Sequence, residues 1–249
     1  DSVVMLSYIV WIAQALAIET TAYEQHFLSH LRSNGMVDYS ALKAHSAREK
    51  SLKDLEQALL PAERTEQIAF WINVYNAITL DLIADNYPLK SILDLDEGKV
   101  WKTRRFLVAG QEVTLDQIEN EILRPMGEPR IHAALNCASL GCPSLLDRAY
   151  TGKDLDVQLS QAMVNWINSN AFVWKKGDLY LNNIFEWYIA DFTANASVDA
   201  LPQKHQKYAG VIAFLQPYLS EKDAKRMLAG NYDIYINQYD WGLNLYQEK

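Results

Sequence analysis

The chain has 249 residues, 49% of them hydrophobic, with 7 tryptophans and 14 tyrosines, so it can bury a substantial core and is not intrinsically disordered. Its 31 acidic residues outnumber its 23 lysines and arginines, and this balance disfavours binding to nucleic acid or to an anionic membrane. Two cysteines are too few for a disulfide scaffold, so the fold must rest on hydrophobic packing.

The N-terminal segment Val3–Ile18 carries no charge. It is shorter than the roughly 20 residues that a membrane-spanning helix needs, and Ala15–Ala17 has the small-x-small pattern of a signal-peptidase site. The first basic residue is Arg32, so the positive start of a signal peptide is missing, and a plain hydrophobic helix is the alternative. We expect residues 1–17 to be signal-like, residues 18–249 to form one domain, and the protein to be secreted or periplasmic, where disulfides persist.

Hydrophobic periodicity and capping signals predict many helices and a little sheet. The expected helices are Tyr23–Ser33, Ala47–Leu60, Glu63–Asn86, Leu115–Leu123, one that opens at Thr151–Asp154 and ends near Asn168, Asn183–Phe192, Gln203–Leu215 and Glu221–Ala229. VDYSALK (37–43) is expected to be a short extended piece and turn, with hairpins at 104–113 and 172–181 and a last strand at 233–239. The sequence lacks internal repeats and low-complexity linkers, so we expect an α+β fold: a helix-rich single domain with a small antiparallel sheet.

The expected helix Glu63–Asn86 is apolar on nearly every side, which is typical of a buried helix. It nevertheless carries Asn73 and Asn76, which are three residues apart and so share one face. An unmatched buried amide costs about 1–3 kcal/mol, so both side chains need partners. They either hold adjacent backbone or face a cleft.

The stretch Arg130–Pro143, RIHAALNCASLGCP, contains both cysteines and one of the five histidines. As a strand it would place Arg130, His132 and Asn136 on one face, and as a helix it would still bring His132 near Asn136. A strand would turn Cys137 to the opposite face unless the chain bends. The small, glycine-containing sequence that follows makes such a bend plausible.

Four explanations of this spacing compete. Cys137 and Cys142 can form a disulfide, although so small a loop adds little stability. A metal site with His132 lacks a fourth ligand and the usual zinc spacing. A thiol nucleophile needs a base such as His132, oriented by Glu119, Asp191 or an asparagine. The last explanation is buried cysteines beside a histidine with satisfied hydrogen bonds.

Two arginines, Arg124 and Arg130, precede the histidine in the sequence. Arg124 and Arg130 can each bind a substrate carboxylate by a two-pronged contact, or form ordinary salt bridges. Asp191 lies among aromatic residues in WYIADF, which favours a bonding partner. The sequence has no glycine-rich phosphate loop and no nucleophile-elbow motif, and we expect no cofactor and no metal.

Five motifs together resemble the domain of unknown function 547 family: VDYSALK (37–43), AFWINVYNAITL (69–80), VTLDQIENEILR (113–124), PRIHAALNCASLGCP (129–143) and WYIADF (187–192). The final YDWGLN (239–244) resembles the tail of bacterial members. The resemblance implies a papain-like or transglutaminase-like fold with a Cys–His site, to which His132 and Cys137 correspond. Papain-like enzymes place the cysteine before the histidine, so the reversed order here requires altered connectivity.

The expected function is that of a cysteine-dependent hydrolase or transferase acting on a peptide or thiol-containing substrate, such as glutathione, by acyl or mixed-disulfide chemistry. In this hypothesis Cys137 attacks, His132 takes the thiol proton and Glu119 orients His132. The expected substrate-binding residues are Asn73, Asn76, Arg124, Arg130, Asn136 and Asp191, and Cys142 is a disulfide partner or resolving thiol. The alternative is a non-catalytic binding module on a degenerate papain-like scaffold with a Cys137–Cys142 disulfide. Neither hypothesis involves nucleic acid, nor a membrane once the signal is removed.

Overall fold

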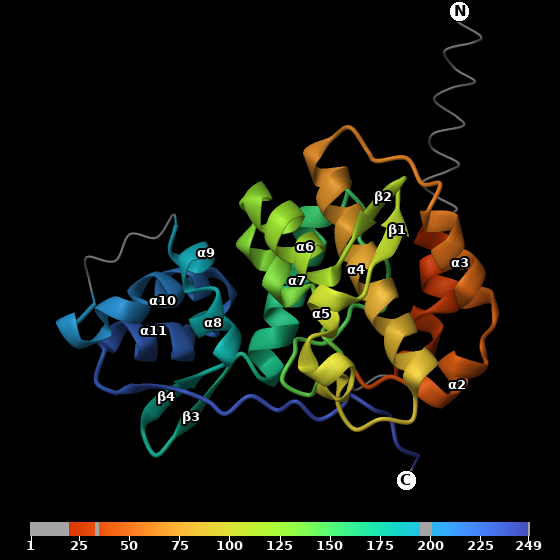
Figure 1. Ribbon diagram of the computed structural model, residues 1–249. Helices are drawn as coiled ribbons and strands as arrows, with labels where there is room; N and C mark the ends of the chain where they lie inside the picture. Colours follow the sequence, from red (N-terminus) through yellow and green to blue (C-terminus); the bar gives the residue numbers. More distant parts are fainter. Residues whose placement is uncertain (1–19, 33–34, 195–200, 249) are drawn as a thin grey trace, which may run out of the picture.

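The computed structural model describes residues 20–32, 35–194 and 201–248 (Figure 1). The expected signal-like segment, residues 1–17, lies outside the described residues. Within the described part of the chain, no helix is both long enough and apolar enough to cross a membrane.

Helices make up most of the described chain. After a helical stretch at residues 20–26, the α-helices are α2 (Tyr39–Ala44), α3 (Ala47–Leu55), α4 (Arg64–Asn86), α5 (Val100–Thr103), α6 (Leu115–Gln117), α7 (Leu155–Ser169), α8 (Asn183–Trp187), α9 (Ile189–Thr193), α10 (Ala209–Leu215) and α11 (Glu221–Ala229). The 3-10 turns are η1 (Leu28–His30), η2 (Ile92–Asp94), η3 (Asp96–Gly98), η5 (Arg124–Met126), η6 (Pro129–Ala133), η7 (Gln203–Tyr208) and η8 (Gln216–Tyr218), and η4 (Ile118–Leu123) is a π-helical turn.

Two small sheets accompany the helices, so the prediction of a helix-rich α+β domain is confirmed. Strands β1 (Phe106–Val108) and β2 (Gln111–Val113) form one antiparallel hairpin, and β3 (Phe172–Lys175) and β4 (Asp178–Leu181) form the other. The last strand, β5 (Ile234–Ile236), pairs with β4 in parallel, which the expectation of an antiparallel sheet did not include. Parallel pairing needs a long crossover, and α8 to α11 provide it (Figure 1).

The segment VDYSALK (37–43) is mostly helical, so the prediction of an extended piece there is wrong. The Asp38 side chain accepts a hydrogen bond from the backbone N–H of Ala41 at 3.0 Å and so caps the start of α2. The segment expected to be an extended piece and turn therefore contains the start of a helix. This short helix packs against α4 and buries Tyr39 and Leu42.

Helix α4 runs through the centre of the molecule, with α2 and α3 on one side and α6 and α7 on the other (Figure 1). Every residue from Ile68 to Ala84 except Asn73 is buried, which confirms the prediction of a buried helix. A helix that is apolar all round can pack against several neighbours at once. The other elements are therefore arranged around α4.

The C-terminal strap, residues 239–246, crosses the molecule from β5 toward the N-terminal helices (Figure 1). The backbone N–H groups of Leu140 and Gly141 donate to the carbonyls of Gly242 and Asp240, both at 2.8 Å. A β-carbon added to Gly141 would lie 2.8 Å from the Tyr239 ring, so a glycine is required for this close approach. The strap thereby brings Tyr239 against the turn that carries the two cysteines.

Arg48 is a buried cation in α3 that pairs with Asp81 and with Asp85 of α4. We expect Arg48→Met to lower the free energy of unfolding by about 3–5 kcal/mol, because it leaves the buried Asp81 carboxylate without a cation. Urea denaturation followed by circular dichroism measures this change. Lys53→Met on the exposed side of α3 is the control and should change stability by less than about 0.5 kcal/mol; equal effects of the two variants would contradict the prediction.

Candidate active site around a disulfide

A pocket of about 520 Å³ lies where α4, α5, η4, α8 and the C-terminal strap meet. This volume is within the usual range for a small-molecule site. The lining residues are Tyr75, Gly98, Lys99, Trp101, Lys102, Asp116, Glu119, Asn120, His132, Leu135, Cys137, Cys142, Ile184, Trp187, Tyr188, Tyr239 and Trp241. The three residues of the expected Cys–His site, Cys137, His132 and Glu119, all lie in this wall.

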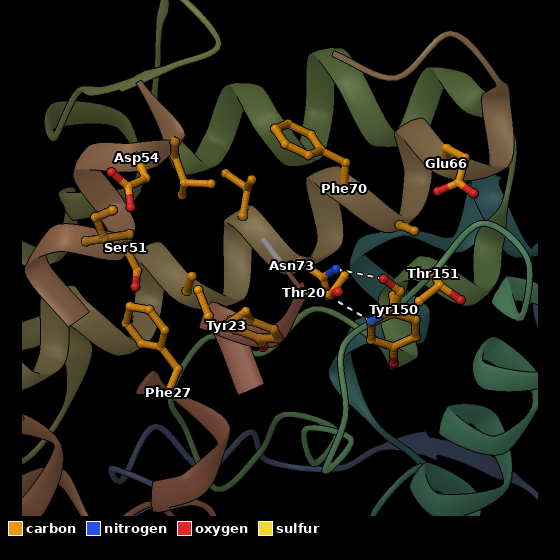
Figure 2. Close-up of a pocket in the computed structure, with 16 residues that line it drawn as sticks. Thr20, Tyr23, Phe27, Ser51, Asp54, Glu66, Phe70, Asn73, Tyr150 and Thr151 are labelled. Carbon is orange, nitrogen blue, oxygen red and sulfur yellow. Dashed lines mark hydrogen bonds between the residues drawn. The ribbon is translucent and has the colours of Figure 1, made fainter. Parts of the chain in front are cut away.

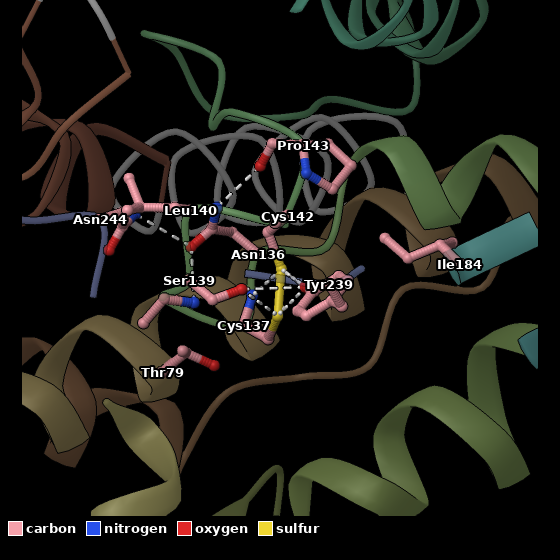
Figure 3. The surroundings of a disulfide bond; sticks show 12 residues. Thr79, Asn136, Cys137, Ser139, Leu140, Cys142, Pro143, Ile184, Tyr239 and Asn244 are labelled. Atoms are coloured by element: carbon pink, nitrogen blue, oxygen red, sulfur yellow. Dashed lines mark hydrogen bonds between the residues drawn. A yellow bond between two sulfur atoms is a disulfide. The ribbon is translucent and has the colours of Figure 1, made fainter. Parts of the chain in front are cut away.

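Cys137 and Cys142 are joined by a disulfide (Figure 3). Of the four explanations of the spacing, the structure therefore contains the disulfide, and neither cysteine is a free thiol in this state. The bend occurs at Ala138, which has a φ of 59° and whose N–H donates to the Asn136 side chain at 2.8 Å. In the described residues, no group of three or more His, Cys, Asp or Glu side chains could hold a metal ion.

The sulfur of Cys142 has two hydrogen-bond donors close by. The backbone N–H of Cys137 donates to it at 3.0 Å, and the Tyr239 hydroxyl donates to it at 3.1 Å (Figure 3). The same hydroxyl lies 3.1 Å from the Cys137 sulfur and 2.9 Å from the Ser139 oxygen. Burial raises the pKa of Tyr239, so its hydroxyl keeps its proton and remains a donor. Negative charge on the Cys142 sulfur would therefore be stabilised in place.

His132 is buried in η6, a 3-10 turn instead of the strand or regular helix considered from the sequence. Its Nε2 lies 2.8 Å from the Asp191 carboxylate, and its ring stacks on Tyr188 with 4.1 Å between the centroids. Its Nδ1 is 3.8 Å from the Glu119 carboxylate, which is too far for a hydrogen bond. Asp191 therefore orients the imidazole, in the role expected for Glu119. With Nε2–H donating to Asp191, a neutral ring keeps its lone pair on Nδ1.

Asp191 also binds Arg124 through both carboxylate oxygens, at 2.6 and 2.9 Å. Burial alone would raise the pKa of Asp191, but the hydrogen bonds from His132 and Arg124 outweigh it and hold that pKa well below its usual range. The carboxylate is therefore ionised at neutral pH, and it holds His132 in one orientation.

Glu119 lies on the π-helical turn η4, which follows the capping box of Thr114 and Gln117 at the start of α6. The capping box was expected from the sequence, but the wider turn was not. π-Helical turns often occur at functional sites. The Tyr75 hydroxyl donates to Glu119 at 3.4 Å. Glu119 is thus an acidic residue of the pocket wall beside His132 and is not its hydrogen-bond partner.

The expected substrate contacts of Arg124 and Arg130 need correction. Arg124 is paired with Asp191, and Arg130 is paired with Glu128 at 2.7 Å and Asp156 at 2.8 Å. Neither arginine is among the residues that line the pocket. Their donor groups are used by internal carboxylates, so they hold the fold together instead of binding a substrate carboxylate.

Two lysines provide the cations of the pocket wall. Lys99 and Lys102 line the pocket, and their side chains are 67% and 75% exposed. Their only ion pairs in the described structure are those with Glu97 at 3.2 Å and Asp116 at 3.8 Å. Exposed pairs of this kind are weak, so both ammonium groups can turn to a ligand.

The expected substrate-binding asparagines also have structural roles. The Asn73 amide donates to the Tyr150 carbonyl at 2.8 Å and accepts from the Tyr150 N–H at 2.9 Å. Asn76 donates to the Ala134 carbonyl and accepts from the Asn136 N–H, both at 2.9 Å. The Asn136 side chain donates to the Pro143 carbonyl at 2.8 Å. These amides hold adjacent backbone, and none of the three lines the pocket with the disulfide.

The sequence reasoning did not single out the aromatic residues of the pocket wall. Tyr239 and Trp241 come from the strap, with ring centroids 4.6 Å apart, and Trp187 lies 4.9 Å from Tyr239. Trp101 packs edge-on against Trp241 at 5.9 Å. Three of these rings, Trp187, Tyr239 and Trp241, lie in the motifs WYIADF and YDWGLN. These motifs were therefore the feature of the sequence from which the aromatic wall could have been predicted.

The comparisons with known proteins give one match. A family described as "Protein of unknown function, DUF547" matches residues 59–167. The match includes α4, Glu119, His132 and both cysteines. No curated protein matches the chain, and no solved structure matches it. The papain-like and transglutaminase-like resemblance therefore stays a prediction.

The lowered pKa of Asp191 predicts how acid destabilises the protein. A carboxylate whose pKa is lower in the folded state adds stability above its unfolded pKa of about 4, and this stability is lost as pH falls through the folded value. We expect the urea midpoint of the wild type to fall more steeply than that of Asp191→Asn between pH 5 and pH 2. The exposed Asp147→Asn variant is the control and should follow the wild type; the prediction fails if Asp191→Asn does so too.

Proposed function

We propose that this chain, which carries a domain of the DUF547 family, is a cysteine-dependent transferase that exchanges its Cys137–Cys142 disulfide with a small thiol or a thiol-containing peptide. The observation that carries the proposal is the pair of hydrogen bonds to the Cys142 sulfur. Donors aimed at a sulfur lower the pKa of its thiol, and a sulfur with a low pKa leaves faster in disulfide exchange.

The position of each sulfur decides which one is attacked. Cys142 is 7% exposed and Cys137 is more open to the pocket. A substrate thiolate therefore attacks the Cys137 sulfur. The bond between the two cysteines breaks, Cys142 leaves as a thiolate, and the substrate becomes joined to Cys137 as a mixed disulfide.

A second thiolate completes the reaction. It attacks the substrate sulfur of the mixed disulfide, and Cys137 leaves as a thiolate. Two substrate thiols have then been oxidised to one disulfide, and the cysteine pair has been reduced by two electrons. The reverse sequence reduces a substrate disulfide and restores the Cys137–Cys142 bond.

The other groups of the pocket have roles in this scheme. The Nδ1 lone pair of His132 takes the proton of the incoming thiol, and Asp191 stabilises the imidazolium that forms. Lys99 and Lys102 meet a substrate carboxylate in place of the arginines expected from the sequence. We place the protein in a secreted or periplasmic compartment, because a bridged pair persists where the surroundings are oxidising.

Replacement of Tyr239 tests the proposed stabilisation of the leaving group. We expect Tyr239→Phe to slow reduction of the disulfide by 2-mercaptoethanol about tenfold, since a hydrogen bond to a charged sulfur contributes about 1.5–3 kcal/mol. Iodoacetamide trapping followed by intact-mass analysis gives the rate. Tyr235→Phe, on the exposed side of β5, is the matched control and should react like the wild type. If both variants and the wild type react no faster than a small linear disulfide, the pair is structural and the protein is a binding module.

Single-cysteine variants test the assignment of the attacked sulfur. Cys142→Ser leaves Cys137 free, and we expect it to form a stable mixed disulfide with bis(2-hydroxyethyl) disulfide, because the resolving thiol is gone. Cys137→Ser leaves only the buried Cys142 and should form its adduct at least tenfold more slowly. Intact-mass analysis over time separates the two. Faster labelling of Cys142 would reverse the assigned roles.

A further inference from the structure

A second cavity, of about 250 Å³, lies on another face of α4 (Figure 2). Phe70, Val74 and Ala77 form one wall, and their spacing of four and three residues places them on one face of the helix. The other apolar lining residues are Ala22, Tyr23 and Phe27 near the start of the described chain, Leu52 and Leu55 of α3, Ala69 of α4, and Tyr150. The two cavities share no lining residue.

Three polar side chains in the wall of this second cavity, those of Asn73, Glu66 and Ser51, have hydrogen-bond partners within the protein. Both amide atoms of Asn73 bind the backbone of Tyr150, as the dashed lines in Figure 2 show. The Glu66 carboxylate accepts from the Gly152 N–H at 3.2 Å, and the Ser51 hydroxyl lies 2.5 Å from His26 Nδ1. Apolar cavities stay dry, and one of about 150 Å³ holds a benzene-sized molecule. This larger cavity has room for one ring with a short chain.

The charged groups of the lining are all acidic. Asp54 and Glu66 carry carboxylates, and the lining residues include no lysine, arginine or histidine. Asp54 is exposed and has no ion pair among those found in the described residues. These two acidic residues of the lining would repel a ligand with a carboxylate head and attract one with an ammonium head.

We propose that this cavity binds a small amine with an aromatic or short alkyl body, whose apolar part enters the cavity while the ammonium group lies beside Asp54. The site is separate from the disulfide pocket and does not depend on thiol chemistry. Burial of the apolar body supplies most of the binding free energy of such an amine. Attraction between its ammonium group and the acidic lining makes it bind more tightly than a ligand of the same size with a neutral or acidic head group.

Three ligands of nearly equal size test the proposal on the full 249-residue chain: 3-phenylpropylamine, 3-phenylpropanol and 3-phenylpropionate. Saturation-transfer NMR and calorimetry at pH 7 measure their binding. We expect the amine to bind about fivefold more tightly than the alcohol and at least tenfold more tightly than the acid, with the differences shrinking at 0.5 M salt. Absence of amine binding, equal binding of all three, or tighter binding of the acid would overturn the proposal.

Variants locate the binding in this cavity. Asp54→Asn should reduce the amine affinity to that of the alcohol, while Glu221→Gln on the distant α11 should leave it unchanged. Ala77→Leu fills the cavity and should abolish binding of the amine and the alcohol. Leu55→Trp, at a partly exposed position of the wall, serves the same purpose if the first variant does not fold. If a folded cavity-filling variant still binds the amine, or if Asp54→Asn leaves the amine affinity unchanged, the ligand binds elsewhere and the assignment is overturned.

Discussion

The amide side chain of Asn76 holds the segment that carries His132 and the two cysteines in place. It lies in the middle of the buried helix α4, and it binds the Ala134 carbonyl and the Asn136 N–H together. A buried amide that lost these partners would cost about 1–3 kcal/mol, so the segment cannot shift along α4 without a penalty. His132 precedes these two backbone groups and Cys137 follows them. One hydrogen-bonded pair therefore positions both sides of the disulfide pocket.

The disulfide turn is held from the other side by the C-terminal strap. Backbone hydrogen bonds from Leu140 and Gly141 to the strap keep the Tyr239 ring against the turn, and the hydroxyl then reaches both sulfurs. The cysteines come from the middle of the chain and Tyr239 from its end, so this arrangement requires the complete fold. It also explains why the sulfurs have polar neighbours although aromatic rings form much of the surrounding wall.

Local signals in the sequence predicted much of the fold. The apolar run of α4, the capping box of Thr114 and Gln117, and both hairpins are encoded by neighbouring residues and appear where expected. The parallel pairing of β5 with β4 was missed because it joins segments separated by about 50 residues, and strand periodicity does not specify the partner. The helix start at VDYSALK (37–43) was taken for a turn because a helix cap and a turn use the same residue types.

The candidate site was predicted only in part, because the sequence does not specify which residues far apart in the chain form contacts. The sequence brought Cys137, His132 and Glu119 together, and they do share one pocket. It could not show that Asp191, 59 residues after His132, would take the hydrogen bond assigned to Glu119. Nor could it show that Arg124 and Arg130 would form salt bridges with carboxylates of the protein itself, because the sequence does not reveal which charged residues pair.

Hydrogen-bond capacity separates structural from reactive groups in this molecule. The side-chain groups of Asn73, Asn76 and Arg130 are engaged by other parts of the fold, so they have little left to offer a ligand. The groups that keep unused capacity in the disulfide pocket are of another kind: the Nδ1 of His132 and the ammonium groups of Lys99 and Lys102. They belong to residues that line the same pocket as a disulfide whose inner sulfur already receives two hydrogen bonds. The presence of a base, of cations and of donors aimed at one sulfur in a single pocket is what supports the proposed exchange chemistry over a static cross-link.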